Sequence, residues 1–155
     1  YGKRVADDQI NPVSMELTKL GIAQSGAGKL TEATDALESA LAVDSRNRAA
    51  YVELASVAKK QGLPGKAIRM YREALLIEPN DVIALSGQGE ALVQKGALNK
   101  AKENLARIEK LCVSACPEQT RLAGVIEKGG QTPVVSAQAI TPKPAITPGS
   151  EKKSD

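Results

Sequence analysis

Small and apolar residues recur along this chain at a spacing of 34 positions, and this period limits its possible folds more than any other feature. Gly28, Gly62 and Gly96 superpose at that spacing, and two further sets keep the same period: Ala33, Ala67 and Ala101, and Leu37, Tyr71 and Leu105. A fixed period of this length is the signature of stacked supersecondary units, each of which buries its apolar face against the next. The chain is therefore expected to form a repeat array.

Each unit carries apolar residues at helical spacing on both sides of its central glycine. In the middle unit these are Tyr51, Leu54, Val57 and Ala58 before Gly62, and Ala67, Tyr71, Ala74 and Leu75 after it. The spacing predicts a pair of antiparallel helices in each of the units 14–47, 48–81 and 82–115, and an all-α chain. A further amphipathic stretch, 117–128, predicts a capping helix that ends at Gly129 and Gly130.

The middle unit resembles the tetratricopeptide repeat. It carries the pattern Tyr51-x-x-Leu54-Ala55-x-x-Ala58, then Gly62, Ala67-x-x-x-Tyr71-x-x-Ala74-Leu75 and a closing Pro79. The first unit has Ser45 where the proline belongs, and the third departs from the pattern after Leu105. The resemblance covers about two thirds of the chain. It implies a right-handed superhelical solenoid of three helix pairs plus a C-terminal capping helix at 14–128, which acts as a non-enzymatic protein-interaction module or scaffold.

The resemblance also implies a peptide-binding groove, because the first helix of each pair lines the concave face in this family. The matching inward positions are Met15, Thr18, Ile22 and Ser25; Ala49, Val52, Ser56, Lys59 and Lys60; and Ile83, Ser86, Glu90 and Val93. The family's clamp for chaperone carboxyl tails is absent, since its positions hold Thr18, Ile22, Glu53, Ile83 and Gly87. We expect a mainly apolar groove that suits an amphipathic helix or an extended apolar peptide of another protein. The alternative is that these residues face solvent or neighbouring helices without any partner.

A glycine-rich stretch suggests a second function. Residues 26–31, Gly-Ala-Gly-Lys-Leu-Thr, resemble part of a loop that binds a nucleotide phosphate. The motif would need glycine at Ala23, a hydroxyl at Leu30 and a preceding strand, and none of these is indicated. Because equivalent glycines recur at the other two turns, we interpret Gly28 as the left-handed end of a helix and Gly21 as a point of close helix approach. Nucleotide binding remains the alternative.

The amino-acid composition argues against several other classes of function. The 155 residues contain no histidine, which removes the commonest general base and transition-metal ligand, and no nucleophile motif is present. We therefore expect no catalytic residue, no metal and no cofactor. The net charge is +3, but basic and acidic residues are interspersed and only three residues are aromatic. We expect no concentrated positive face and no nucleic-acid partner. No apolar run approaches the roughly 20 residues of a membrane helix.

The two cysteines, Cys112 and Cys116, fall where the last repeat helix should meet the capping helix. Zinc would need two more soft or imidazole ligands, and the spacing differs from that of redox-active pairs. Two readings remain, a structural disulfide or two packed thiols. We favour the disulfide, which implies an oxidising compartment such as the periplasm or cell envelope, with the cytoplasm as the alternative.

The two ends differ from the repeat region. Residues 1–13 form a lead-in that opens on Tyr1, and we expect a processed product whose signal peptide or anchor would lie upstream. Residues 129–155 are rich in proline and threonine, so we expect a disordered tail that either dangles or tethers a partner. We expect a monomer.

Overall fold

The computed structural model describes residues 6–131, which form a short 3₁₀ helix followed by seven α-helices. Their bounds are η1 Asp7–Gln9, α1 Pro12–Gly26, α2 Leu30–Val43, α3 Arg48–Lys60, α4 Pro64–Ile77, α5 Val82–Gln94, α6 Leu98–Leu111 and α7 Pro117–Gln131. No strand occurs among the described residues, and the prediction of an all-α helical solenoid is confirmed. The tail beyond 131 lies outside the described residues.

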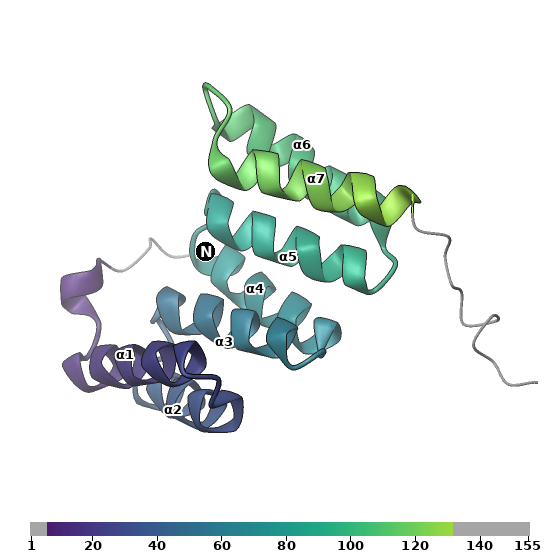
Figure 1. Ribbon diagram of the computed structural model, residues 1–155. Helices are drawn as coiled ribbons and strands as arrows, with labels where there is room; N and C mark the ends of the chain where they lie inside the picture. Colours follow the sequence, from purple (N-terminus) through teal and green to yellow (C-terminus); the bar gives the residue numbers. More distant parts are fainter. Residues whose placement is uncertain (1–5, 132–155) are drawn as a thin grey trace, which may run out of the picture.

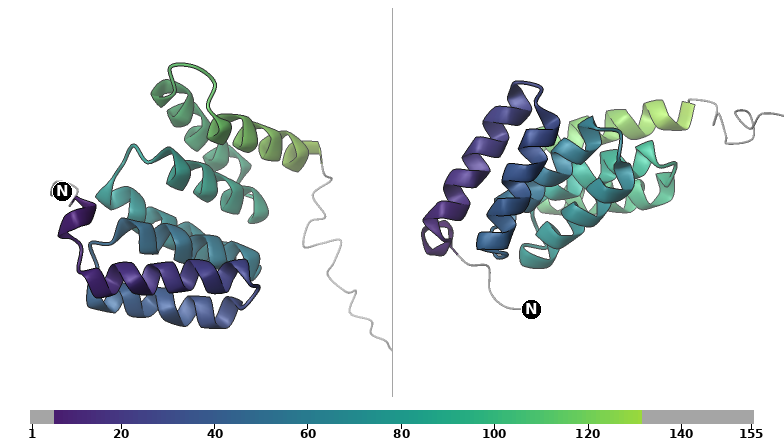
Figure 2. Two further views of the ribbon diagram at one scale, coloured as in Figure 1. Left: turned by 60° about the vertical axis from the view of Figure 1, so that its left-hand side comes forward. Right: turned by 90° about the horizontal axis from the view of Figure 1, so that it is seen from below.

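The helices stack as three hairpins, α1–α2, α3–α4 and α5–α6, with α7 packed on both α5 and α6 (Figure 1). Each hairpin contacts the next mainly through its second helix, since α2 packs on α3 and α4 packs on α5, and smaller contacts join α1 to α3 and α3 to α5. The first helices and α7 lie in front in Figure 1, and the second helices lie behind them. The two further views in Figure 2 show the resulting elongated stack.

Glycine makes the turn within each hairpin. Gly28, Gly62 and Gly96 have φ angles of 80°, 76° and 85°, in the left-handed region that L-residues with a side chain rarely adopt. After each glycine the next amide N–H donates to a carbonyl five residues earlier, at 2.8 to 2.9 Å: Lys29 to Gln24, Leu63 to Ala58, and Ala97 to Leu92. These bonds satisfy carbonyls at the helix end, as in a Schellman motif. The interpretation of Gly28 as a helix end is therefore confirmed.

Helix α7 runs three residues beyond its expected end at Lys128. Gly129 and Gly130, which were expected to stop it, lie within the helix. A Cβ on Gly129 would come 2.6 Å from Cγ1 of Val93, so a side chain there would collide with α5. Gly129 therefore permits close packing of α7 and does not end the helix. At the other end of the chain, α1 begins at Pro12, two residues before the predicted unit.

The buried core residues recur with the 34-residue period of the repeat. Alanines at the same place in each second helix, Ala33, Ala67 and Ala101, are all fully buried, which lets neighbouring helices approach closely. One apolar cluster runs without a break from α3 to α7, and a smaller one joins α2 to α3. Leu122 and Ile126 of α7 are 0% and 7% exposed, so the capping helix completes the core of the last pair.

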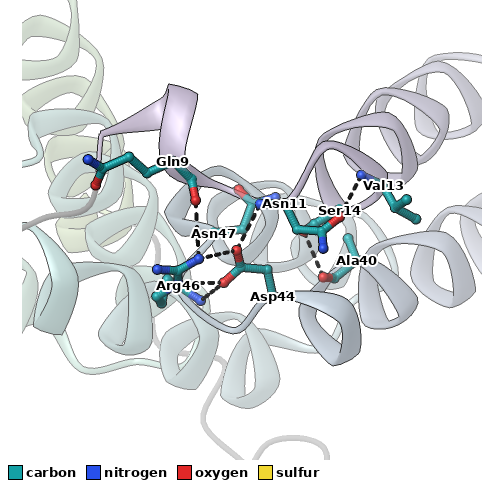
Figure 3. Close-up of polar contacts among 8 residues, drawn as sticks. All are labelled: Gln9, Asn11, Val13, Ser14, Ala40, Asp44, Arg46 and Asn47. Carbon is teal, nitrogen blue, oxygen red and sulfur yellow. Dashed lines mark hydrogen bonds and ion pairs between the residues drawn. The ribbon is translucent and has the colours of Figure 1, made fainter.

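A polar cluster ties the start of the solenoid to the turn between the first two hairpins (Figure 3). The Asp44 carboxylate accepts hydrogen bonds from the backbone N–H of Asn11 at 2.9 Å and from Arg46 Nη2 at 2.8 Å. Arg46 also donates to the carbonyl of Gln9 at 3.1 Å. These bonds, first of all the one from Arg46, hold the pKa of Asp44 well below its ordinary value. Gln9 and Asn11, which directly precede α1, are therefore anchored by charge-assisted bonds.

Candidate functional site: a hollow on the concave side

A hollow of about 160 Å³ lies among the first helices α3 and α5 and the capping helix α7. Tyr71 of the second helix α4 also lines it, through a side chain that is only 3% exposed. The lining residues are Val52, Glu53, Ser56, Lys59, Tyr71, Ile83, Ser86, Gly87, Glu118 and Arg121. Gly87 gives the Tyr71 ring room, because a Cβ on Gly87 would lie 2.3 Å from Cζ of the tyrosine.

Five of the predicted groove residues line this hollow: Val52, Ser56, Lys59, Ile83 and Ser86. Ile83 is 56% exposed and Val52 is partly buried, so both offer apolar surface. Ser86 is only 3% exposed, and its hydroxyl donates to the carbonyl of Glu118 at 3.2 Å. The structure therefore brings these five predicted residues of α3 and α5 together.

The predicted groove residues of α1 do not join them. Thr18 is buried, and its hydroxyl donates to the carbonyl of Ser14 at 2.8 Å while accepting from Asn47 Nδ2 at 3.0 Å. Its place on the concave face was wrongly predicted, because Asn47 at the start of α3 holds the Thr18 hydroxyl between the hairpins. Met15 and Ile22 lie outside the hollow, and Ile22 is 45% exposed.

Four other predicted residues also lie outside the lining. Ala49 is exposed at the start of α3. Lys60 donates from Nζ to Oγ of Ser25 at 2.8 Å, which ties α3 to α1. Val93 packs on Gly129 beneath the capping helix. Glu90 does not line the hollow, but it pairs with a residue that does.

Four of the ten residues that line the hollow are charged, although the groove was expected to be mainly apolar. Nζ of Lys59 lies 2.5 Å from Oε1 of Glu90 and 5.8 Å from the centre of the Tyr71 ring. Nε of Arg121 lies 3.9 Å from the other oxygen of Glu90. One carboxylate thus neutralises part of the charge of two cations. Burial, and then the charge of Glu90, raise the pKa of the Tyr71 phenol.

Two further carboxylates in the lining have no such neutralising partner. Glu53 and Glu118 make no side-chain hydrogen bond or ion pair within the described residues. Burial raises the pKa of the Glu53 carboxyl, and the nearby charge of Lys60 opposes the rise only in part. The hollow thus presents partly desolvated, unpaired acceptors.

The predicted groove set omitted half of the lining, namely Glu53, Tyr71, Gly87, Glu118 and Arg121, although Glu53 and Gly87 had been matched to positions of the family's clamp. Glu118 and Arg121 were not predicted because residues 117–128 were interpreted only as a capping helix that buries the apolar edge of the third helix pair. In the structure α7 lies beside α5 as a further first helix would (Figure 1). Extending the groove positions into α7 would have pointed to both residues.

The glycine-rich stretch has the structure of a hairpin turn. Gly26 ends α1, Gly28 forms the left-handed turn, and Leu30 begins α2. A helix precedes the stretch where a phosphate-binding loop requires a strand. The described residues also hold no group of three or more cysteine or acidic side chains placed to bind a metal.

The cysteines are disulfide-bonded, with an S–S distance of 2.08 Å and a Cα–Cα distance of 6.0 Å. Cys112 caps the end of α6, and Cys116 directly precedes α7. The bond therefore closes the connection that places Glu118 and Arg121 beside the hollow.

A second hollow contradicts the expectation that no positive face forms. It has a volume of about 440 Å³, and Arg69, Arg72, Lys95 and Lys100 line it. These cations come from α4, from the end of α5 and from the first turn of α6. The two arginines are far from the two lysines in the sequence, and the stacking of two hairpins brings them together in space.

Comparison with known proteins decides the family. A profile of the tetratricopeptide repeat matches residues 18–75 and 52–107, more than half of the chain. The chain belongs to the tetratricopeptide repeat family. No curated protein matches it by sequence. No helix in residues 6–131 is both long enough and apolar enough to cross a membrane.

Several solved tetratricopeptide repeat structures share the fold. The TPR domain of Sgt2 from Aspergillus fumigatus is 19% identical, with 96% of each chain covered and a TM-score of 0.72. The type III secretion chaperone SycD of Yersinia enterocolitica, solved with a peptide of the translocator YopD, is 22% identical over 79% of this chain and 96% of that one, with a TM-score of 0.68. The first TPR of Spaghetti (RPAP3), bound to the HSP90 peptide SRMEEVD, is 19% identical over 77% and 97%, with a TM-score of 0.69.

Proposed function

We propose that this tetratricopeptide repeat protein is a non-enzymatic interaction module that holds a peptide of another protein against the concave hollow. One observation carries the proposal: two apolar side chains, Val52 and Ile83, line the same hollow as two carboxylates that form no ion pair, Glu53 and Glu118. A peptide with apolar residues beside a lysine or arginine complements that surface.

The size of the hollow favours a peptide side chain over a small molecule. Its volume of about 160 Å³ is below the roughly 300–1,000 Å³ of typical small-molecule pockets. One long side chain fits such a space while the rest of the peptide lies along α3 and α5.

Two of the structural neighbours were solved with peptides, which supports the same general use here. The bound HSP90 peptide, SRMEEVD, is acidic. Carboxylates at Glu53 and Glu118 would repel such a tail, and Glu90 already engages Lys59. The preferred peptide of this chain is therefore basic and amphipathic.

We further propose that the protein works in the cell envelope, as an assembly or secretion adaptor. The disulfide between Cys112 and Cys116 supports this setting, since such bonds persist in oxidising compartments. The expected monomer presents one such concave hollow per chain, which fits an adaptor that holds one basic segment of a partner there.

Selection from a random peptide display library tests the proposal. Enriched peptides should carry a lysine or arginine next to apolar residues, and a synthetic copy with glutamate in place of the basic residue should lose binding. Val52→Lys should abolish binding, because it removes an apolar contact and repels the basic residue of the peptide, whereas Ala49→Lys, the same charge change at an exposed position of α3 outside the hollow, should not. No enrichment, or equal binding by both variants, would contradict the proposal.

A further inference from the structure

The second hollow gathers four cations on the side of the solenoid formed by the second helices. Arg69 and Arg72 extend from α4, Lys95 follows α5, and Lys100 lies in the first turn of α6. None of the nine residues lining this hollow is acidic. It shares no residue with the concave hollow.

The four cations are unpaired. None of them makes a hydrogen bond or an ion pair within residues 6–131, although other basic residues nearby do, such as Lys66 with Glu38 at 3.2 Å. Two of them converge on one point, because a Cβ on Gly65 would lie 3.5 Å from Nζ of Lys95 and 3.8 Å from Nη1 of Arg69. Like charges this close repel each other unless an anion lies between them.

The floor of the hollow is apolar. Ile68 and Leu92 line it with side chains that are 9% and 7% exposed, and Ala97 lies beside them. An adjoining depression of about 240 Å³ shares both residues, together with Arg72 and Lys100, and adds the carboxylate of Glu103. The positive charge therefore surrounds an apolar strip and remains in excess.

From this geometry we propose that the second hollow is a separate docking site for an acidic segment of a partner protein, in which one apolar side chain is flanked by aspartate or glutamate. The guanidinium groups of Arg69 and Arg72 bind carboxylates, and the Ile68–Leu92 floor takes the apolar side chain. A nucleic acid would use the charges but not the floor, and only three aromatic residues occur in the whole chain to stack on bases.

The site lies away from the concave hollow, so the protein can hold two segments at once. Such two-segment binding rests on the proposed function: the basic peptide of the concave side and the acidic segment of this side carry opposite charges, and neither would fit the other hollow. A chain that engages both gains affinity through the high local concentration of the second segment. The solenoid thereby bridges two chemically distinct partner segments.

Fluorescence anisotropy with a labelled synthetic peptide, Glu-Glu-Leu-Glu-Glu, tests this inference on the full chain. The wild type should bind it at about 0.05 M salt and weaken several-fold at about 0.5 M. Arg69→Glu combined with Lys100→Glu should lower the affinity by roughly tenfold or more. Arg72→Gln combined with Lys95→Gln provides a milder second pair. Lys102→Glu, an exposed position of α6 outside the lining, is the matched control and should leave binding unchanged.

Three results would overturn the inference: no binding by the wild type at low salt, equal loss in Lys102→Glu, or tighter binding of single-stranded polyuridine than of the peptide. Replacing the central leucine by serine should also weaken binding, and an unchanged affinity would refute the role of the apolar floor. Val52→Lys should leave acidic-peptide binding intact, so failure at either hollow can be distinguished from failure at the other.

Discussion

Replacing Gly21 by alanine isolates the close packing that the glycine-rich stretch provides. Gly21 is buried in the middle of α1, and an added Cβ would lie 2.5 Å from Cγ and 2.8 Å from Cδ2 of Leu37. The contacted Cγ is the branch point of the leucine, so a rotation about χ2 does not remove the clash. Leu37 is itself 0% exposed and is packed in the apolar cluster that joins α2 to α3. The helices α1 and α2 must therefore separate.

The expected loss in the free energy of unfolding is the overpacking penalty minus the gain in helix propensity. Inserting a methyl group into a packed core costs about 1–3 kcal/mol, and alanine gains up to about 1 kcal/mol over glycine within a helix. Gly21→Ala should therefore lower the free energy of unfolding by about 1–2 kcal/mol. Gly26→Ala is the matched control in the same helix, because no atom lies within 4 Å of its added Cβ. It should raise stability by a few tenths to about 1 kcal/mol.

Urea denaturation followed by far-ultraviolet circular dichroism measures both changes, with the slope of the transition checked for each variant. Ala55 fills the equivalent place in the second unit and is fully buried there. If the first hairpin can relax to that wider geometry at no cost, Gly21→Ala will be neutral and the argument from Leu37 fails. A loss of stability in Gly26→Ala as large as that in Gly21→Ala would also refute it.

Three further predictions concern polar and covalent links. Arg46 holds the pKa of Asp44 below its usual 3.8, so Asp44 stabilises the fold above about pH 4 and this contribution is lost as the pH falls further; Asp44→Asn should remove that part of the acid dependence in pH-dependent melting. Asn47→Ala should cost about 2 kcal/mol in urea denaturation, because it leaves two buried hydroxyls without their donor; a loss under about 0.5 kcal/mol would contradict this. Reduction of Cys112–Cys116 should speed hydrogen exchange in 112–131 and leave the first two hairpins protected, whereas uniform acceleration would refute a local role.

Much of the fold was predictable because each unit repeats the same local signals. The glycines at 28, 62 and 96 stand where a left-handed residue must end a helix, and helical spacing on either side predicted the pairs. The end of α7 was not predictable from such signals. In the sequence, Gly129 resembles a residue that ends a helix. Only the position of Val93 in the neighbouring helix α5 shows that Gly129 allows close packing of α7.

The candidate site was predictable only in part. Positions counted along the first helices correctly brought Val52 and Ile83 to one hollow, because stacked units present equivalent residues to the same side. Repeat positions alone could not show that Asn47 donates a hydrogen bond to the Thr18 hydroxyl. They also could not show that α7 would add Glu118 and Arg121 to the hollow. Hydrogen bonds between hairpins and the placement of the capping helix decided those outcomes.

The sequence by itself determined the all-α repeat, its hairpin turns and the family, because these depend on local spacing and backbone conformation. Only the tertiary structure decided the charge of the surfaces. Side chains 25 to 30 positions apart, such as Arg69 and Lys95, are independent in the sequence and become neighbours when one hairpin stacks on the next. Electrostatic interaction depends on distance through space, so a chain with evenly mixed charges folds into one hollow with unpaired carboxylates and another with unpaired cations.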